Sequence, residues 1–107
     1  MSVSHVNTVE ALNKAFADAG DKLVVVDYFA TWCGPCMMMK PKFEAMAKEF
    51  DGKAIFVKVD VDESEEVAEK AGIQVLPTFM LYKGGNKVAE MSGASDAKLR
   101  DLVNANC

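Results

Sequence analysis

The stretch LVVVDYFATWCGPC, residues 23–36, decides the fold. Its first part, residues 23–30, is an apolar run interrupted by Asp27, which is typical of a central strand buried on both faces. Two cysteines, Cys33 and Cys36, follow where a helix is expected to begin. A strand that delivers a cysteine pair to the start of a helix predicts a reactive dithiol rather than a structural cross-link.

Around this stretch, hydrophobic periodicity predicts strands that alternate with helices. The expected strands cover residues 2–6, 22–30, 54–59, 77–82 and 87–91. The expected helices are one capped by Asn7 and stopped by Gly20, one over about residues 33–50, one capped by Asp62 or Ser64 and stopped by Gly72, and one over residues 95–106. This order implies parallel strands with helices on both faces, and the last two strands form a hairpin that makes the sheet mixed.

Two of the expected helices carry further local signals. Asn7 followed by Glu10 resembles an N-cap with a reciprocal acidic residue. Pro41 lies inside the second helix and removes one backbone donor, so we expect a bend near residues 37–40.

Composition limits the classes of partner and compartment. A length of 107 residues, half of them hydrophobic and about a quarter charged, suits one globular domain over residues 1–107. The formal net charge of -4, without a basic cluster, argues against nucleic acid as a partner. No apolar run approaches the roughly 18 residues of a membrane span, and residues 1–7 do not resemble a secretory signal. Three cysteines then fit a reducing compartment, so we expect a cytoplasmic protein.

The spacing of Cys33 and Cys36 suits reversible disulfide chemistry. Residues three apart on a helix have Cβ atoms about 5–6 Å apart, and a disulfide needs roughly 3.5–4.5 Å, so a small tightening closes the bond. As a cross-link it would stabilise the chain by only roughly 2 kcal/mol. At the positive end of the helix dipole the pKa of the Cys33 thiol should fall. Cys36, one turn deeper and less exposed, would resolve the mixed disulfide that Cys33 forms with a substrate.

A metal site is the main alternative for two closely spaced cysteines. Structural zinc usually requires four ligands. The remaining candidates are Cys107 and His5, which lie at opposite ends of the chain. A redox dithiol is therefore the favoured interpretation.

The motif WCGPC at residues 32–36, with Asp27 upstream and Leu76-Pro77-Thr78 downstream, closely resembles the thioredoxin family. The resemblance runs from about Val24 to Gly93 without a gap. It implies the thioredoxin fold, a mixed five-stranded sheet flanked by four helices, and an oxidoreductase that reduces protein disulfides in electron transport and cell redox homeostasis. It also implies a thioredoxin reductase as electron donor, NADPH acting through that reductase, and disulfide-containing substrates such as peroxiredoxins and reductases. The chain contains neither of the two common nucleotide-binding glycine motifs, so we expect no bound cofactor.

The resemblance also assigns roles around the dithiol. Asp27 would lie beneath it and exchange a proton with the buried cysteine. The next strand can supply Lys58, which we expect to be a supporting charge rather than a catalyst. A purely structural Asp27–Lys58 pair is the alternative. The bond before Pro77 would be cis, and the backbone of Leu76 would pair with a substrate peptide. The expected substrate-binding rim consists of Trp32, Gly34, Pro35, Val75, Leu76, Pro77, Gly93 and Ala94.

Some positions depart from the family pattern. Met37 stands where the family usually has lysine or arginine, which bears on the redox potential and the choice of reductase. Phe29 replaces a tryptophan common in the family. Cys107, the last residue, is either an inert tail or a thiol that joins two chains by a disulfide; otherwise we expect a monomer.

Two rival functions keep the fold. One is a disulfide oxidase or isomerase, but such relatives often carry histidine between the cysteines, where this chain has Gly34-Pro35. The other is a non-catalytic binding module, which would retain its activity after both cysteines were replaced by serine.

Overall fold

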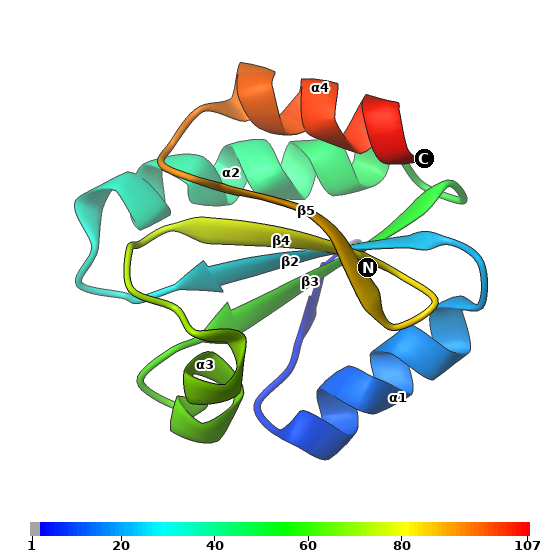
Figure 1. Cartoon of the computed structure of the whole chain (residues 1–107). Helices are drawn as coiled ribbons and strands as arrows, with labels where there is room; N and C mark the ends of the chain where they lie inside the picture. The colour runs from blue at the N-terminus through cyan, green and yellow to red at the C-terminus, as the bar shows by residue number, and fades with distance from the viewer. Residues whose placement is uncertain (1–2) are drawn as a thin grey trace.

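The computed structural model describes residues 3–107, in which five strands form one mixed sheet of order β1-β3-β2-β4-β5 (Figure 1). The strands are β1 (Val3–His5), β2 (Leu23–Phe29), β3 (Ala54–Asp60), β4 (Thr78–Lys83) and β5 (Asn86–Ser92). β1, β3 and β2 run parallel, whereas β4 is antiparallel to both β2 and β5. The predicted α/β architecture with a mixed sheet is confirmed.

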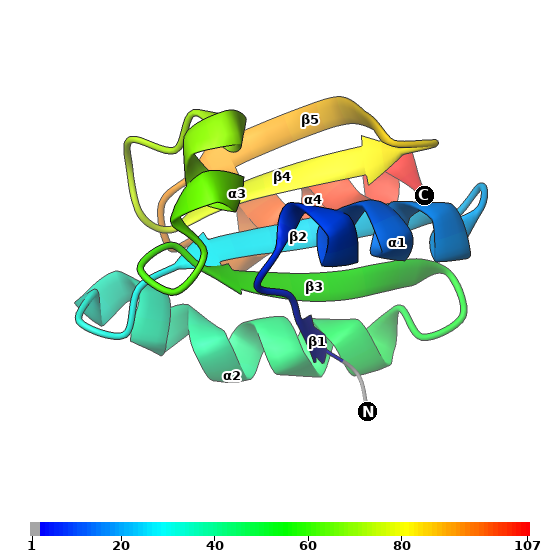
Figure 2. The same cartoon turned by 90° about the horizontal axis from the view of Figure 1, so that it is seen from below.

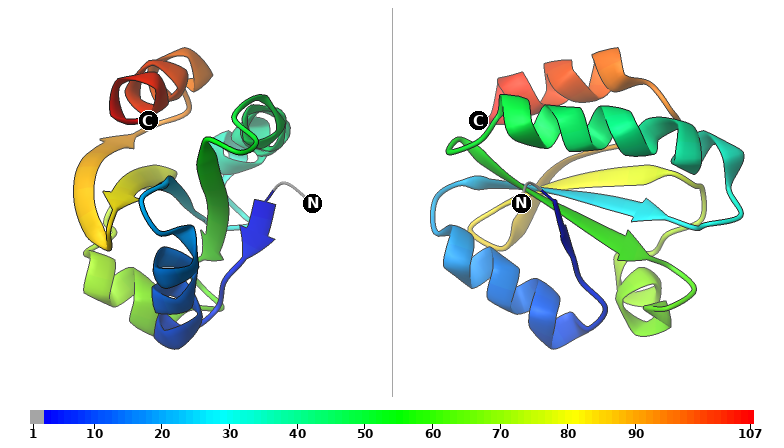
Figure 3. Two further views of the ribbon diagram at one scale, coloured as in Figure 1. Left: turned by 90° about the vertical axis from the view of Figure 1, so that its right-hand side faces the viewer. Right: turned by 180° about the vertical axis from the view of Figure 1, so that it is seen from behind.

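Helices cover both faces of the sheet. Those in the described part of the chain are α1 (Val9–Ala19), α2 (Gly34–Glu49), α3 (Glu65–Ala71) and α4 (Asp96–Asn106). α2 and α4 lie side by side on one face, and α1 and α3 lie on the other (Figures 1 and 3). None of the helices within residues 3–107 combines the length and apolar character that crossing a membrane requires.

Alternation along β2 divides the core into two clusters. Leu23 and Val25 pack with α2 and α4, whereas Val24, Val26 and Tyr28 pack on the opposite side. Side chains two apart on a strand share a face, so the residue that follows Val25 on the α2 side is Asp27. The buried strand thus places one carboxyl group on the face that α2 covers.

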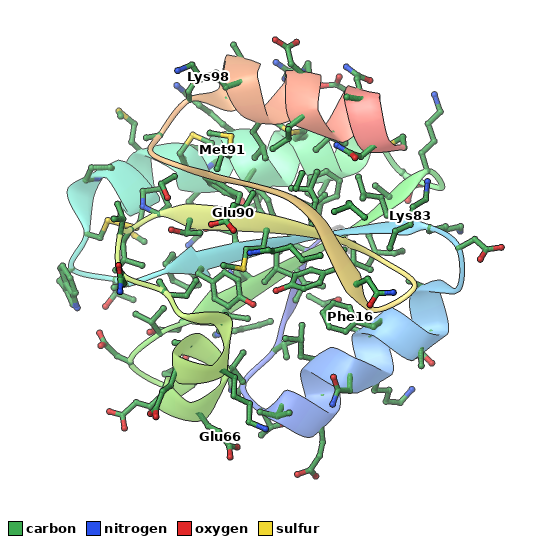
Figure 4. The ribbon with its side chains drawn as sticks, viewed as in Figure 1. Phe16, Glu66, Lys83, Glu90, Met91 and Lys98 are labelled. Carbon is green, nitrogen blue, oxygen red and sulfur yellow. A yellow bond between two sulfur atoms is a disulfide. The ribbon has the colours of Figure 1, made fainter. Side chains whose placement is uncertain are left out.

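Aromatic side chains fill the centre of the cluster beneath α2. The Phe43 ring of α2 lies 5.1 Å from the Phe56 ring and 5.8 Å from the Phe79 ring, measured between centroids. On the opposite face, Phe16 of α1 extends toward the sheet and its ring centroid lies 4.6 Å from that of Tyr82 (Figure 4). Both helices are therefore held to the sheet by ring contacts.

The first helix begins one residue later than predicted. Thr8, not Asn7, is the N-cap, and its side-chain oxygen accepts a hydrogen bond from the Ala11 amide at 3.0 Å. With Thr8 as the cap, Glu10 is the second helical residue rather than the third. It is therefore out of place for a reciprocal bond and instead adds a negative charge to the first turn, where the helix dipole favours it.

The other termini follow the predicted signals more closely. Ser64 occupies the N-cap of α3, although its side chain makes no capping bond. Ser95 caps α4 by accepting a hydrogen bond from the Lys98 amide at 3.3 Å. The predicted hairpin is confirmed: Gly84 and Gly85 have φ angles of 59° and 82°, the left-handed pair that a tight two-residue turn requires.

Helix α2 continues through Pro41. Its first turns are set off from the rest of the helix, as Figure 1 shows at the left of the molecule. This displacement agrees with the bend expected near Pro41, because proline lacks the amide that would bond to the preceding turn.

Candidate dithiol site

The cysteine pair lies at the start of α2, directly after the loop that follows β2. Cys33 is the N-cap of α2, and its Sγ accepts a hydrogen bond from the Cys36 amide at 3.2 Å. The two residues form a disulfide with their Cα atoms 5.2 Å apart. Because the Cys33 sulfur faces an amide at the positive end of a helix, this position favours a thiolate once the disulfide is reduced.

The two sulfurs differ in access. Cys33 is 7% exposed and Cys36 is 2% exposed, as expected for a pair that enters a helix from its end. Both pack against Ala30, with Phe29, Met37 and Leu76 partly buried around them. The prediction that Cys36 is the more deeply buried cysteine is confirmed.

Asp27 is buried on the same face of the sheet as α2. It is 5% exposed, and its Oδ1 atom has no hydrogen-bond partner in the structure. Burial raises the pKa of Asp27 to about 7, although the positive charge of Lys58 opposes that rise. A carboxyl group that titrates near neutrality can both accept and return a proton under physiological conditions.

Lys58 is the register partner of Asp27 on β3. The ion pairs between described residues do not include one that joins these two side chains. The Lys58 ammonium instead lies 6.0 Å from the centroid of the Phe29 ring. The structure therefore favours a supporting charge at this position over a closed structural pair.

A pocket of about 260 Å³ reaches both Asp27 and Cys36. Lys40, Lys58, Met37, His5 and Glu63 are among the residues that line it. Its opening gives the buried carboxyl group and the inner cysteine a route to solvent.

A second segment approaches the dithiol from β4. The Leu76–Pro77 bond is cis, as predicted. The Thr78 hydroxyl donates a hydrogen bond to the Val75 carbonyl at 2.5 Å, and the Gly93 amide donates one to the Pro77 carbonyl at 3.0 Å. These bonds place the predicted rim residues of the 75–77 loop next to Gly93, whose φ of 98° is favourable only for glycine.

Trp32 is the most exposed large apolar residue of the rim. It is 72% exposed, and Val75 is 55% exposed. The Trp32 indole Nε1 donates a hydrogen bond to Asp62 Oδ2 at 2.8 Å. The sequence indicates Asp62 only as a candidate helix cap, because no local pattern predicts a contact between residues 30 positions apart.

Cys107 lies away from this site. It is an exposed free thiol at the C-terminus, which Figure 1 places at the opposite end of the molecule from the start of α2. Within residues 3–107, no group of three or more histidine, cysteine or acidic side chains is arranged to hold a metal ion.

Comparison with known proteins identifies close relatives. The family model described as Thioredoxin matches residues 3–105. A thioredoxin of Geodia cydonium is 48% identical over 105 residues, which cover 97% of this chain and 98% of that protein. The crystal structure of the reduced Schistosoma mansoni thioredoxin pre-protein has a TM-score of 0.93 and 42% identity, and the match covers 100% of both chains. A chain in the crystal structure of the complex of ferredoxin:thioredoxin reductase and thioredoxin f2 has a TM-score of 0.91 and 30% identity, over 97% of this chain and 94% of that chain.

Proposed function

The chain belongs to the thioredoxin family of dithiol/disulfide oxidoreductases, and we propose that Cys33 and Cys36 reduce protein disulfides with electrons that a thioredoxin reductase passes on from NADPH. Protein-disulfide reduction is the activity of this family, and the close cysteine pair is its redox centre. The two cysteines carry the exchange themselves, so the reaction requires no cofactor bound to this chain.

Substrate reduction proceeds in two sulfur transfers. The Cys33 thiolate attacks one sulfur of a substrate disulfide, forms a mixed disulfide and releases the other substrate sulfur as a thiolate. Cys36 then loses its proton and attacks the Cys33 sulfur. The second substrate thiolate leaves, the Cys33–Cys36 disulfide forms, and two electrons have passed to the substrate.

The observation that carries this proposal is the hydrogen bond from the Cys36 amide to the Cys33 sulfur at the N-cap of α2. The same amide and the helix dipole stabilise negative charge on that sulfur. They therefore favour Cys33 as the thiolate that attacks the substrate disulfide.

Asp27 serves as the proton acceptor for Cys36. Its pKa of about 7 means that about half of the carboxyl groups are ionised at neutral pH. The pocket that Asp27 shares with Cys36 supports transfer of the proton through water. During re-reduction the same group can return the proton to the Cys36 thiolate.

The exposed rim serves to dock substrate. Trp32 and Val75 present apolar surface beside the more accessible cysteine, which suits protein disulfides of varied sequence. Gly34, Pro35, Gly93 and Ala94 complete the rim, and the backbone at Leu76 offers a short strand-like contact to an extended substrate peptide.

The similarity to a chain crystallised in a complex with ferredoxin:thioredoxin reductase supports a reductase as the electron donor. NADPH as the ultimate donor, and peroxiredoxins and other reductases as substrates, belong to the proposal. So do a monomeric state and a location in the cytoplasm, where such a dithiol is kept reduced.

The test is reduction of insulin by the protein with thioredoxin reductase and NADPH, measured as the oxidation of NADPH. We expect turnover in the native protein and none in Cys33→Ser, whereas Cys107→Ser, a matched removal of one thiol outside the site, should leave the rate unchanged. Activity of Cys33→Ser equal to native would overturn the mechanism. Turnover with dithiothreitol but not with the reductase would overturn the assigned electron donor.

A further inference from the structure

His5 is a titratable group of the dithiol pocket that the proposed mechanism does not use. It lies at the end of β1, which forms the edge of the sheet beside β3 and close to α2 (Figure 2). Its side chain lines the same pocket as Asp27 and Cys36. The pocket therefore extends from the buried carboxyl group to the sheet edge.

Strand register connects His5 to Asp27. His5 is the register partner of Lys58, and Lys58 is the register partner of Asp27. Register partners on neighbouring strands share a face of the sheet. The three side chains thus form a row across β1, β3 and β2, and with strands about 4.8 Å apart the ends of the row are ~10 Å from each other.

The charges around His5 come from several elements. Nε2 of His5 lies 3.3 Å from Oε1 of Glu63, in the segment before α3. Lys58 and Asp60 of β3, Lys40 of α2 and Asp27 of β2 complete the titratable groups of the pocket lining besides Cys36.

Two other residues of the pocket lining, Asp60 and Met37, leave the charge on His5 largely uncompensated. Oδ1 of Asp60 accepts hydrogen bonds from the amides of Asp62 and Glu63, so its charge is directed to the backbone. Met37 brings no charge to the lining. The pair formed by His5 and Glu63 is neutral when the imidazole is protonated and negative when it is not.

We propose that His5 is a positioning residue of the dithiol site, an inference that rests on the proposed function. A positive charge on its imidazole, at the open end of the pocket, favours the ionised form of Asp27 that accepts the Cys36 proton. Without it, the negative charge of Glu63 opposes ionisation of Asp27.

The size of the effect follows from distance. Two charges ~10 Å apart alter each other's ionisation midpoint by about 0.3 pH unit in bulk water and by about 1 unit at the dielectric typical of a protein surface. The His5 side chain is 40% exposed, which places the coupling between these limits.

The experiment compares His5→Lys, which makes the charge permanent, with His5→Gln, which removes it. The ionisation midpoint of Asp27 is followed by ¹³C NMR of its carboxyl carbon in the disulfide form. We expect the midpoint to be lowest in His5→Lys, intermediate in the native protein and highest in His5→Gln, with the two variants separated by about 0.3–1 unit. Equal midpoints in the two variants would overturn the inference.

Two further variants test whether the shift depends on the charges beside His5 or on the net charge of the protein. Glu63→Gln leaves His5 in place and removes the opposing charge, so the Asp27 midpoint should fall. Lys14→Gln makes the same change in charge as loss of a protonated His5, but it lies on α1, where Lys14 pairs with Asp18 at 2.7 Å, and it should leave the midpoint unchanged. An equal shift in Lys14→Gln would show an effect of net charge and would overturn the role of His5.

Activity provides the second readout. The ratio of the insulin-reduction rate at pH 6 to that at pH 8.5 should be larger in His5→Lys than in His5→Gln. Separated midpoints without any insulin reduction in the native protein would overturn the proposed function but not the charge coupling. Insulin reduction with equal midpoints would overturn the role of His5 alone.

Discussion

Asp27 combines burial with a task that requires charge. Burial raises its pKa to about 7, and Lys58 limits that rise without closing a direct ion pair. A carboxyl group paired at short range would stay ionised and could not return a proton to Cys36. The loose arrangement of charges at the pocket is therefore suited to proton exchange.

Asp27→Asn should remove this exchange and slow insulin reduction by up to ~10²-fold, the low end of general acid–base effects. Because only ionised Asp27 accepts the Cys36 proton, the native rate should rise as pH increases through about 7, and that inflection should be absent from the variant. Stopped-flow measurement of mixed-disulfide resolution between about pH 5 and 9 covers the ionisation of Asp27. An inflection that persists unchanged in Asp27→Asn would remove the carboxyl group from the proton path.

Trp32 depends on Asp62 for its orientation. Asp62→Ala should raise KM for insulin several-fold, since the exposed indole loses its hydrogen-bond partner and pays more conformational entropy on docking. Asp62→Asn retains an acceptor oxygen and should preserve most of the native KM. The rate of Cys33 alkylation by iodoacetamide should be similar in both variants, and a lower rate in Asp62→Ala alone would locate the effect at the sulfur rather than at the docking surface.

At the scale of elements, local pattern and long-range packing contribute differently. The apolar run of β2 and the glycines of the hairpin are local signals, and both elements form where predicted. Helix α1 is capped by Thr8 instead of Asn7. Both side chains can accept an amide hydrogen bond, so their residue types alone do not select between them. The N-cap of α1 was therefore less predictable from sequence than β2 or the hairpin.

The cap of α1 offers a direct comparison. Thr8→Ala should lower the free energy of unfolding by about 1 kcal/mol, because the Ala11 amide loses its acceptor. Asn7→Ala, one residue earlier, should change it by less than about 0.5 kcal/mol. Urea denaturation of the two variants measures both changes in the free energy of unfolding. A larger loss in Asn7→Ala than in Thr8→Ala would identify Asn7 as the N-cap.

The candidate site shows the same division. Cys33, Cys36 and Asp27 could be found from one stretch of sequence, since strand and helix pattern places all three. The position of Pro77 beside them followed only from resemblance to a family. The contacts of Trp32 with Asp62 and of His5 with Glu63 were not predicted, because each joins loops or strand ends that only the folded sheet brings together.

For the whole molecule, the buried carboxyl group couples stability to pH. The pKa of Asp27 is raised from 3.8 to about 7 on folding, so the folded state retains a proton that the unfolded chain has lost. Stability from this group is fully present below about pH 4, falls as pH rises, and is lost above about pH 7. The loss amounts to about 4 kcal/mol at most.

Asp27→Asn should accordingly be more stable than the native protein at pH 8. This difference in the free energy of unfolding should shrink toward about pH 4, which is close to the pKa of an aspartate in the unfolded chain. Chemical denaturation of the disulfide form at several pH values measures this difference. Asp101→Asn, which removes an exposed carboxyl group from α4, is the matched control and should follow the native curve. A native–variant difference that stays constant with pH would exclude Asp27 as the source.

The alternation of side chains along β2 makes the spacing of its residues as consequential as their identity. Deleting a single valine before Asp27 would invert the strand from that point, turning the carboxylate toward α1 and α3 and leaving the inner sulfur without its base. Replacing one valine by isoleucine keeps every side chain on its own side. Related chains should therefore tolerate exchange of aliphatic residues in this segment but not insertions or deletions within it.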